Sequence, residues 1–184
     1  MKRLVSMLLL AAMLLLLCSC SEDKIASSGN TLAGYDGGNK AVDYSFEYPE
    51  DWELSSNDGV VAIKIDCDSS SSTSRYATIN VMAFTLSDDQ KNCGARDYWN
   101  THSGEIESTY GDYSLLDEAE ISIDGIPALR VKYTGSLTEN VYTFSQSICI
   151  RNGVVYIITL SALQDDFDNV FADYETVLNT FYFN

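Results

Sequence analysis

Two glycine-containing dipeptides constrain the fold of this chain more than any other feature. Asp124-Gly125 separates two strand-like runs, and Asn152-Gly153 separates two more. Both dipeptides tolerate the positive φ angles of a two-residue turn, so each predicts a tight hairpin of antiparallel strands. The chain is therefore expected to contain an antiparallel sheet. The four predicted strands are residues 121–123, 128–133, 141–151 and 154–161.

Earlier segments add strands to this sheet. Residues 44–54 read as a strand with a break at Pro49, and residues 60–65 read as another. In the run 76–84, apolar side chains alternate onto both faces. A strand with two apolar faces is covered on both sides, so we expect this one to be central.

A helical region is predicted after these strands. Ser87 and Gln90 have the spacing of a capping box, which predicts a helix from there to about Tyr110. Gly94 and Gly104 lie inside this stretch and are expected to break or fray it.

The last helix has the clearest pattern. From Asp165 to Phe181, apolar residues recur at three-and-four spacing. Aspartates crowd the first turn, where the helix dipole favours negative charge. Strands followed and interrupted by helices predict an α+β fold, an αβα sandwich in which helices cover an antiparallel sheet.

The N-terminus has the pattern of a secretion signal. A basic Met1-Lys2-Arg3 head precedes an apolar run, residues 4–17, that is shorter than the roughly 17–25 residues of a transmembrane helix. The run ends in Leu17-Cys18-Ser19-Cys20, which resembles the lipobox of bacterial lipoproteins. That resemblance implies removal of residues 1–19 and a lipid on Cys20, with two acyl chains giving stable anchoring. An ordinary signal cut nearby and an uncleaved anchor are the alternatives.

The stretch that follows the lipobox predicts a tether. Residues 20–41 are rich in Gly, Ser, Asn and Asp, a composition typical of a flexible segment spanning roughly 25 Å. The globular domain is predicted to occupy residues 42–184.

The charge of the chain limits its partners. It has 27 acidic and 11 basic residues, a net charge of −16, and loss of Lys2 and Arg3 would make this −18. Such a surface excludes nucleic acid as a partner and favours cations or basic proteins.

Three cysteines remain for the folded part besides Cys18 and the lipobox Cys20. Their odd number leaves at least one thiol unpaired within the chain. Cys67 and Cys93 flank a predicted strand, whereas Cys149 lies inside one, so Cys67–Cys93 is the predicted pairing if a disulfide forms. Beside Cys67, Asp66 and Asp68 offer oxygen ligands for a cation, but a solvated loop is the simpler interpretation.

Catalytic motifs are missing from the sequence. His102 is the only histidine, and there is no Gly-x-Ser-x-Gly or Cys-x-x-Cys motif. We therefore predict no catalytic residue, no metal and no cofactor.

Several segments resemble the PsbP-like domain family. The segment 44–52, YSFEYPEDW, resembles its F-x-Y-P-x-x-W opening, and 125–133 is similar to its Gly-x-Pro-Ala strand. Residues 153–160 and a helix ending in Asn179-Thr-Phe181 are similar to its closing elements. The resemblance covers residues 42–184 and implies a sheet between helices.

The resemblance also bears on function. Chloroplast members are extrinsic photosystem II subunits that retain calcium and chloride, and many bacterial members are lipoproteins. The chain lacks both the basic N-terminal segment and the histidine set of the photosynthetic branch, since His102 stands alone. The resemblance therefore implies the fold and not the photosynthetic role.

These observations predict a membrane-tethered lipoprotein that acts as a non-catalytic binding or accessory module. It would lie on the extracytoplasmic face of the bacterial cell membrane, bound to the bilayer through Cys20 and to a membrane-proximal protein partner. The alternatives are an extracellular hydrolase that uses carboxylates and a cation-binding surface protein. A deep cleft with converging titratable groups would favour the hydrolase, and carboxylates clustered on one exposed face would favour the cation binder.

Overall fold

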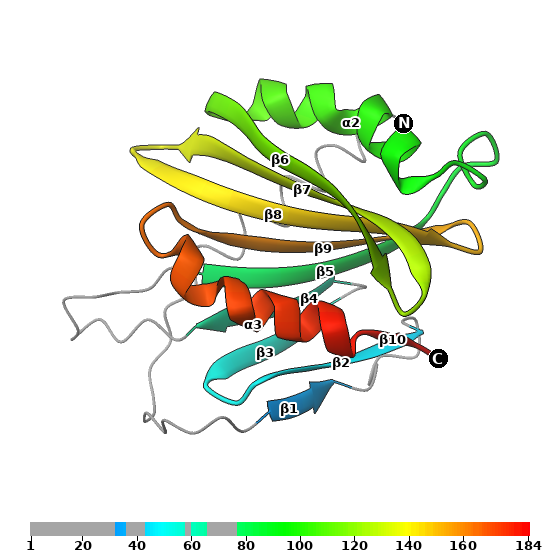
Figure 1. Ribbon diagram of the computed structural model, residues 1–184, viewed down its shortest axis with the longest axis horizontal. Coiled ribbons are helices and arrows are strands. Elements are labelled where there is room, and N and C mark those ends of the chain that lie inside the picture. Colours follow the sequence, from blue (N-terminus) through cyan, green and yellow to red (C-terminus); the bar gives the residue numbers. More distant parts are fainter. Residues whose placement is uncertain (1–31, 36–42, 58–59, 66–76) are drawn as a thin grey trace.

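The computed structural model describes residues 32–35, 43–57, 60–65 and 77–184 (Figure 1). Within these residues, seven strands form one antiparallel sheet in the order β3-β4-β5-β9-β8-β7-β6. The strands are β3 (Trp52–Asn57), β4 (Val60–Ile65), β5 (Ala77–Thr85), β6 (Gly111–Ile123), β7 (Ile126–Leu137), β8 (Asn140–Arg151) and β9 (Val154–Leu163).

Both predicted tight hairpins are confirmed. Asp124 and Gly125 have φ angles of 45° and 74°, and Asn152 and Gly153 have 53° and 75°. The strands on either side of each turn pair directly, β6 with β7 and β8 with β9. A third turn, in which Thr138 has a φ of 56°, joins β7 to β8 without a glycine. The sequence therefore shows no comparable signal for this turn.

A second, smaller sheet shows that part of the predicted tether is folded. In the described residues it has three strands in the order β1-β2-β10, where β1 is Leu32–Tyr35, β2 is Tyr44–Pro49 and β10 is Tyr182–Phe183. Strand β1 lies inside the predicted tether 20–41 but pairs with β2 and buries Tyr35 against the ring of Phe46, 5.1 Å away. These four residues belong to the folded part because aromatic burial holds them there. The rest of the predicted tether lies outside the described residues.

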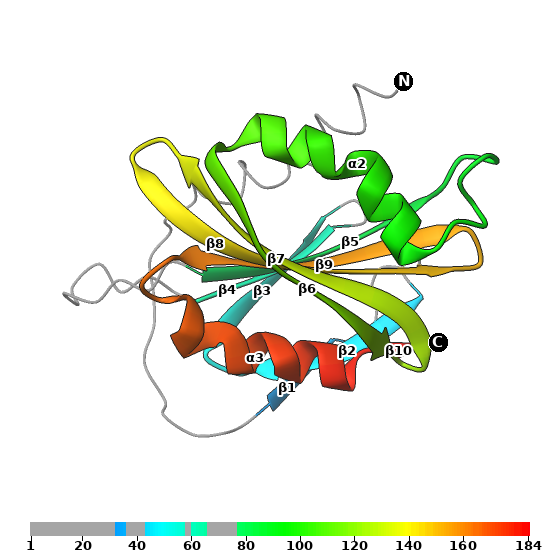
Figure 2. The same ribbon diagram turned by 45° about the horizontal axis from the view of Figure 1, so that its top comes forward.

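Two helices pack on opposite faces of the large sheet (Figure 2). Helix α2 (Ala95–Thr109) buries Tyr98 and Trp99 against β7 and β8, and helix α3 (Phe167–Thr180) packs on β9 and β5. The predicted α+β fold with an antiparallel sheet is confirmed. The layer on the α3 face is not a plain helix layer, because β2 and its small sheet lie beside α3.

Helix α2 begins later than predicted. Ser87 and Gln90 form a turn in which the Gln90 amide donates to the Ser87 carbonyl at 2.9 Å, and the helix starts only after Gly94. No side chain caps its first turn. The helix runs through Gly104 without a break, so the expected disruption there is wrong. Neither helix among the described residues is long and apolar enough to cross a membrane.

Strand alternation sorts the core into two clusters. On β9, Ile158 and Leu160 face α3, whereas Val155 and Ile157 face α2. Strand β5 has apolar groups on both faces, as predicted, and lies inside the sheet between β4 and β9. Strand β6 is different, because it forms an outer edge of the sheet and most of its side chains are exposed.

Candidate functional site

Strand β6 presents the most distinctive exposed surface among the described residues. It borders the sheet next to α2 (Figure 1) and pairs on one side only, with β7. Leu115 is 48% exposed and Leu116 is 51% exposed, and an acidic stretch follows them. We refer to the following five residues as the β6 edge surface: Leu115, Leu116, Asp117, Glu118 and Glu120.

A β-bulge explains why two consecutive leucines are exposed. In a regular strand, neighbouring side chains alternate between faces, so one of two leucines would turn towards the core. Here Leu115 pairs with Tyr133 and Asp117 with Lys132, which leaves Leu116 as the extra residue of a bulge. Bulges redirect side chains at sheet edges and recur near functional sites.

Two acidic side chains of the edge surface, those of Glu118 and Glu120, face the start of α2. Arg96 Nη1 lies 2.8 Å from Glu118 Oε2, and Arg96 Nε lies 3.5 Å from Glu120 Oε1. Trp99 Nε1 donates to the other Glu118 oxygen at 3.0 Å. These contacts fix Glu118 in place at the boundary between helix and strand.

Further carboxylates surround the start of β6. Burial, and then the charges of Glu107 and Glu118, raise the pKa of the Tyr113 phenol. Asp112 accepts a hydrogen bond from the Ser136 hydroxyl at 3.4 Å. Strand β6 has four carboxylates, and the basic side chains beside it in the described residues are Arg96 of α2 and Arg130 and Lys132 of β7. Arg130 and Lys132 also pair with carboxylates of α3, so the local potential at β6 is negative.

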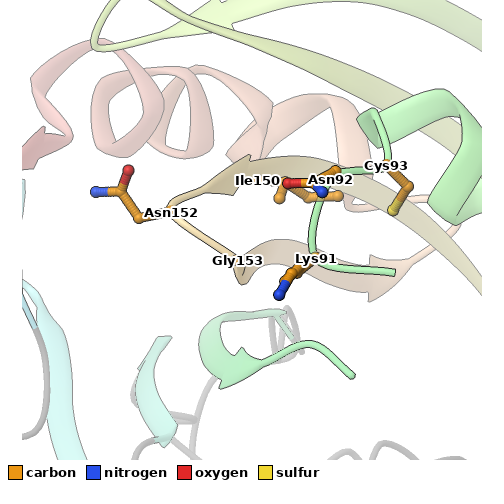
Figure 3. Close-up of a pocket in the computed structure, with 6 residues that line it drawn as sticks. All are labelled: Lys91, Asn92, Cys93, Ile150, Asn152 and Gly153. Atoms are coloured by element: carbon orange, nitrogen blue, oxygen red, sulfur yellow. The ribbon is translucent and has the colours of Figure 1, made fainter. Parts of the chain in front are cut away.

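A shallow pocket of about 410 Å³ is the second candidate (Figure 3). Two segments line it, the loop before α2 with Lys91, Asn92 and Cys93, and the β8–β9 hairpin with Asn152 and Gly153. The side chains of Lys91 and Asn152 point in different directions (Figure 3). The polar groups of this pocket do not converge on a common point.

The thiol in this pocket is not an activated nucleophile. Burial, and then the nearby charge of Asp97, raise the pKa of Cys93, whereas a reactive cysteine has a lowered pKa. His102 lies on α2 with its Nε2 3.2 Å from Gln90 Nε2 and its Nδ1 3.9 Å from Glu105 Oε2. The described residues thus place no activated cysteine–histidine pair here.

Four of the residues predicted from the sequence to form sites are not among the described residues. Cys20, Asp66, Cys67 and Asp68 lie outside the described residues, so the lipid anchor, the cation candidate and the Cys67–Cys93 pairing stay predictions. In the described ranges, no group of three or more His, Cys, Asp or Glu side chains is arranged to hold a metal ion.

The predicted position of Cys149 inside a strand is confirmed, because the residue lies in β8. The residue lies fully buried on the α3 face, where burial raises its pKa to about 12.

Sequence reasoning missed the β6 edge surface. One signal was available, because the adjacent Leu115 and Leu116 interrupt the alternation expected of a half-buried strand. Which strand forms the edge of the sheet was not predictable, since this depends on the order of all seven strands.

Comparison with known sequences gives one clear result. The family model described as "PsbP-like protein" matches residues 21–183, most of the chain. No curated protein matches the chain.

Solved structures share the fold at low sequence identity. PsbP from the cyanobacterium Synechocystis has a TM-score of 0.59 and 19% identity, and the match covers 91% of this chain and 99% of that one. The Ran-binding protein Mog1p of Saccharomyces cerevisiae has a TM-score of 0.59 and 7% identity, covering 84% and 96%. LpqN of Mycobacterium tuberculosis, which is involved in cell envelope biogenesis, has a TM-score of 0.55 and 14% identity, covering 84% and 86%. At these identities the likeness concerns the fold alone.

Proposed function

Because the chain belongs to the PsbP-like protein family, we propose that it works as an accessory protein that binds a partner and does not itself catalyse a reaction. The observation that carries this proposal is the β6 edge surface, which exposes two leucines beside carboxylates on a strand that pairs on one side only in the described residues. Exposed apolar side chains that lie together and are rimmed by polar residues are one feature of protein–protein contact sites.

The proposed location is the extracytoplasmic face of the cell membrane. The apolar run 4–17 and the lipobox-like Leu17-Cys18-Ser19-Cys20 support this location. The fold shared with LpqN, an envelope-biogenesis protein, agrees with it. A lipid on Cys20 would hold the domain close to the bilayer and raise its effective concentration for partners there.

The proposed partner is a membrane-proximal protein with a basic surface. The chain has a net charge of −16, so a basic partner would be attracted over a longer range than a neutral one. Salt screens such attraction, with a Debye length of about 10 Å at 0.1 M. Binding should therefore weaken progressively as the salt concentration rises.

The partner proposal is tested by capture on the immobilised domain. We expect a membrane-fraction protein to bind at low salt and to elute as salt rises, and Asp117→Asn to weaken this binding. Asp165→Asn removes the same charge from an exposed position at the approach to α3 and serves as the control. Capture that is indifferent to salt would contradict the electrostatic attraction. Turnover of a cell-wall or peptide substrate, abolished by one carboxylate substitution, would contradict the non-catalytic role.

The anchor proposal has its own test in cells. Cys20→Ser should abolish incorporation of labelled palmitate and leave the precursor uncleaved, whereas Cys18→Ser should leave both unchanged. Normal labelling of the Cys20→Ser protein would refute the anchor without bearing on the partner.

A further inference from the structure

We propose that the outer edge of β6 binds an extended, basic segment of the partner protein as an additional strand of the sheet. This inference rests on the proposed function and assigns the surface and the mode of binding. The contact would combine main-chain hydrogen bonds along β6 with side-chain contacts to the β6 edge surface.

The hairpin turn determines which backbone groups of β6 point outward. Asp124 and Gly125 form the two-residue turn, so Ile123 and Ile126 are the hydrogen-bonded pair that closes it. Hydrogen-bonded and non-hydrogen-bonded pairs alternate in an antiparallel ladder. The amide and carbonyl groups of Glu118, Glu120 and Ser122 therefore point away from β7, towards the open edge.

These outward groups have no strand beside them in the described structure. Strand β6 is the last member of the seven-stranded order, and its residues from 114 to 118 are all exposed. The opposite edge, β3, is six residues long against thirteen for β6. At β3, Trp52 is buried and donates to Asp173 at 3.2 Å. Strand β6 therefore offers the longer and more accessible template.

Charge identifies the occupant as basic. Asp117, Glu118 and Glu120 line the edge. Arg96 of α2 contacts Glu118 and Glu120. Lys132 is the β7 partner of Asp117 but places its Nζ 3.8 Å from Asp168 at the start of α3. Lysine or arginine side chains on an added strand would lie beside these carboxylates, and opposite charges on adjacent strands stabilise pairing. A second copy of the chain would bring a net charge of −16 towards the same edge and would be repelled.

The two exposed leucines indicate that the bound segment also contains apolar residues. Leu115 and Leu116 are both about half exposed because of the bulge. An apolar side chain on the added strand would remove part of this surface from water. The partner segment should therefore contain both basic and apolar residues, and it should be extended when bound.

The same features protect the edge from uncontrolled self-association. Bulges and charges are common devices that prevent edge strands from pairing with copies of themselves. Strand β6 has two register irregularities, one near Asp112 and one at Leu116. The carboxylates repel an acidic copy of the chain, but they attract a basic strand.

A synthetic peptide of alternating lysine and valine is the probe for this inference. We expect it to bind the domain and to slow hydrogen exchange at the amides of Glu118, Glu120 and Ser122. The matched control is the same peptide N-methylated at every residue, which keeps the charge but has no amide hydrogen to donate at either edge of the strand. Because several main-chain hydrogen bonds are lost, we expect the methylated peptide to bind more than about tenfold more weakly.

A pair of protein variants tests the same edge from the other side. Glu120→Pro removes one outward amide hydrogen at an edge position, where proline is tolerated. Glu120→Gln removes the same charge and keeps the amide. We expect the proline variant to bind the peptide more weakly than the glutamine variant. If the proline variant does not fold, the comparison of methylated and unmodified peptides still decides.

The outcomes separate this inference from the proposed function. Equal binding of the two peptides, or exchange protection away from β6, would overturn the edge inference even if salt-dependent capture of a partner persists. Dimerisation that is lost in Glu120→Pro would identify a second copy as the occupant and would also overturn it. Normal peptide binding at β6 without capture of any membrane protein would count against the proposed partner alone.

Discussion

A single glycine at the junction of α2 and β7 gives the sharpest test of this packing. A Cβ atom built on Gly135 would lie 2.5 Å from the Cβ of Tyr110 and 2.8 Å from its Cγ. Ordinary contacts between carbon atoms are about 3.5–4.0 Å. Gly135→Ala should therefore destabilise the protein, because the added methyl group occupies space that Tyr110 already fills.

The position of Tyr110 determines how much stability the Gly135→Ala protein loses. Tyr110 is 7% exposed, ends α2 directly before β6, and its ring centroid lies 4.8 Å from that of Phe144. Its Cβ is attached to the backbone, so rotation of the side chain cannot relieve the clash, and the end of α2 or the strand must move. Overpacking typically costs about 1–3 kcal/mol, and we expect about 2–3 kcal/mol here. For a chain of this size, that loss lowers the melting temperature by roughly 5–10 °C.

Urea unfolding measures this cost directly, with a second glycine as the control. Gly104 lies in the interior of α2, and a Cβ there meets nothing within 4 Å. Gly104→Ala should therefore stabilise the protein by about 0.5–1 kcal/mol, because alanine favours the helix. The same chemical change thus has opposite signs at the two positions.

A double variant tests the cause of the destabilisation. In a Tyr110→Gly background the clash is absent, so Gly135→Ala should cost less than about 1 kcal/mol there. A Gly135→Ala protein as stable as the parent, or an equal cost in both backgrounds, would refute the close approach of α2 and β7.

Three further predictions concern buried polar groups. Burial raises the pKa of Tyr133 and Tyr174. Below about pH 10 both phenols are protonated in the folded and the unfolded chain, so they do not change the stability with pH. Above about pH 10 the two tyrosines ionise in the unfolded chain but not in the folded one, so the free energy of unfolding falls by up to about 1.4 kcal/mol per pH unit for each tyrosine. Urea unfolding between about pH 8 and pH 11 measures this loss, and a flat profile would contradict it. Tyr174→Phe should lower the free energy of unfolding by about 1–2 kcal/mol, because the Tyr174 hydroxyl donates to the Ser147 hydroxyl at 2.7 Å in the core. Urea unfolding measures this loss, and an unchanged stability would contradict the contribution of this hydrogen bond. In the reduced, folded protein, a thiol reagent should label Cys93 well before Cys149, because Cys149 is buried and burial raises its pKa to about 12. Equal labelling rates of the two cysteines would contradict the burial of Cys149.

The sequence alone predicted the elements that depend on local chemistry. The turns at Asp124-Gly125 and Asn152-Gly153 require positive φ angles, and the residues that tolerate them are visible without any tertiary context. The periodic apolar face of α3 is equally local, because residues three and four apart meet on one side of a helix. Antiparallel pairing of the hairpin strands followed from the short turns.

Only the tertiary structure decided the contacts between distant segments. Strand β1 looked like tether by composition, yet pairing with β2 and burial of Tyr35 place it in the fold. The close approach of Gly135 to Tyr110 leaves no mark in the sequence beyond the glycine itself. The open edge at β6 depends on the strand order, which arises from packing between residues far apart in the chain. Turns and helices are predictable from the sequence because the residues that stabilise them lie within a few positions of one another. Whether a strand lies at the edge of a sheet depends instead on how all the strands are ordered, and this order is set by packing between distant segments.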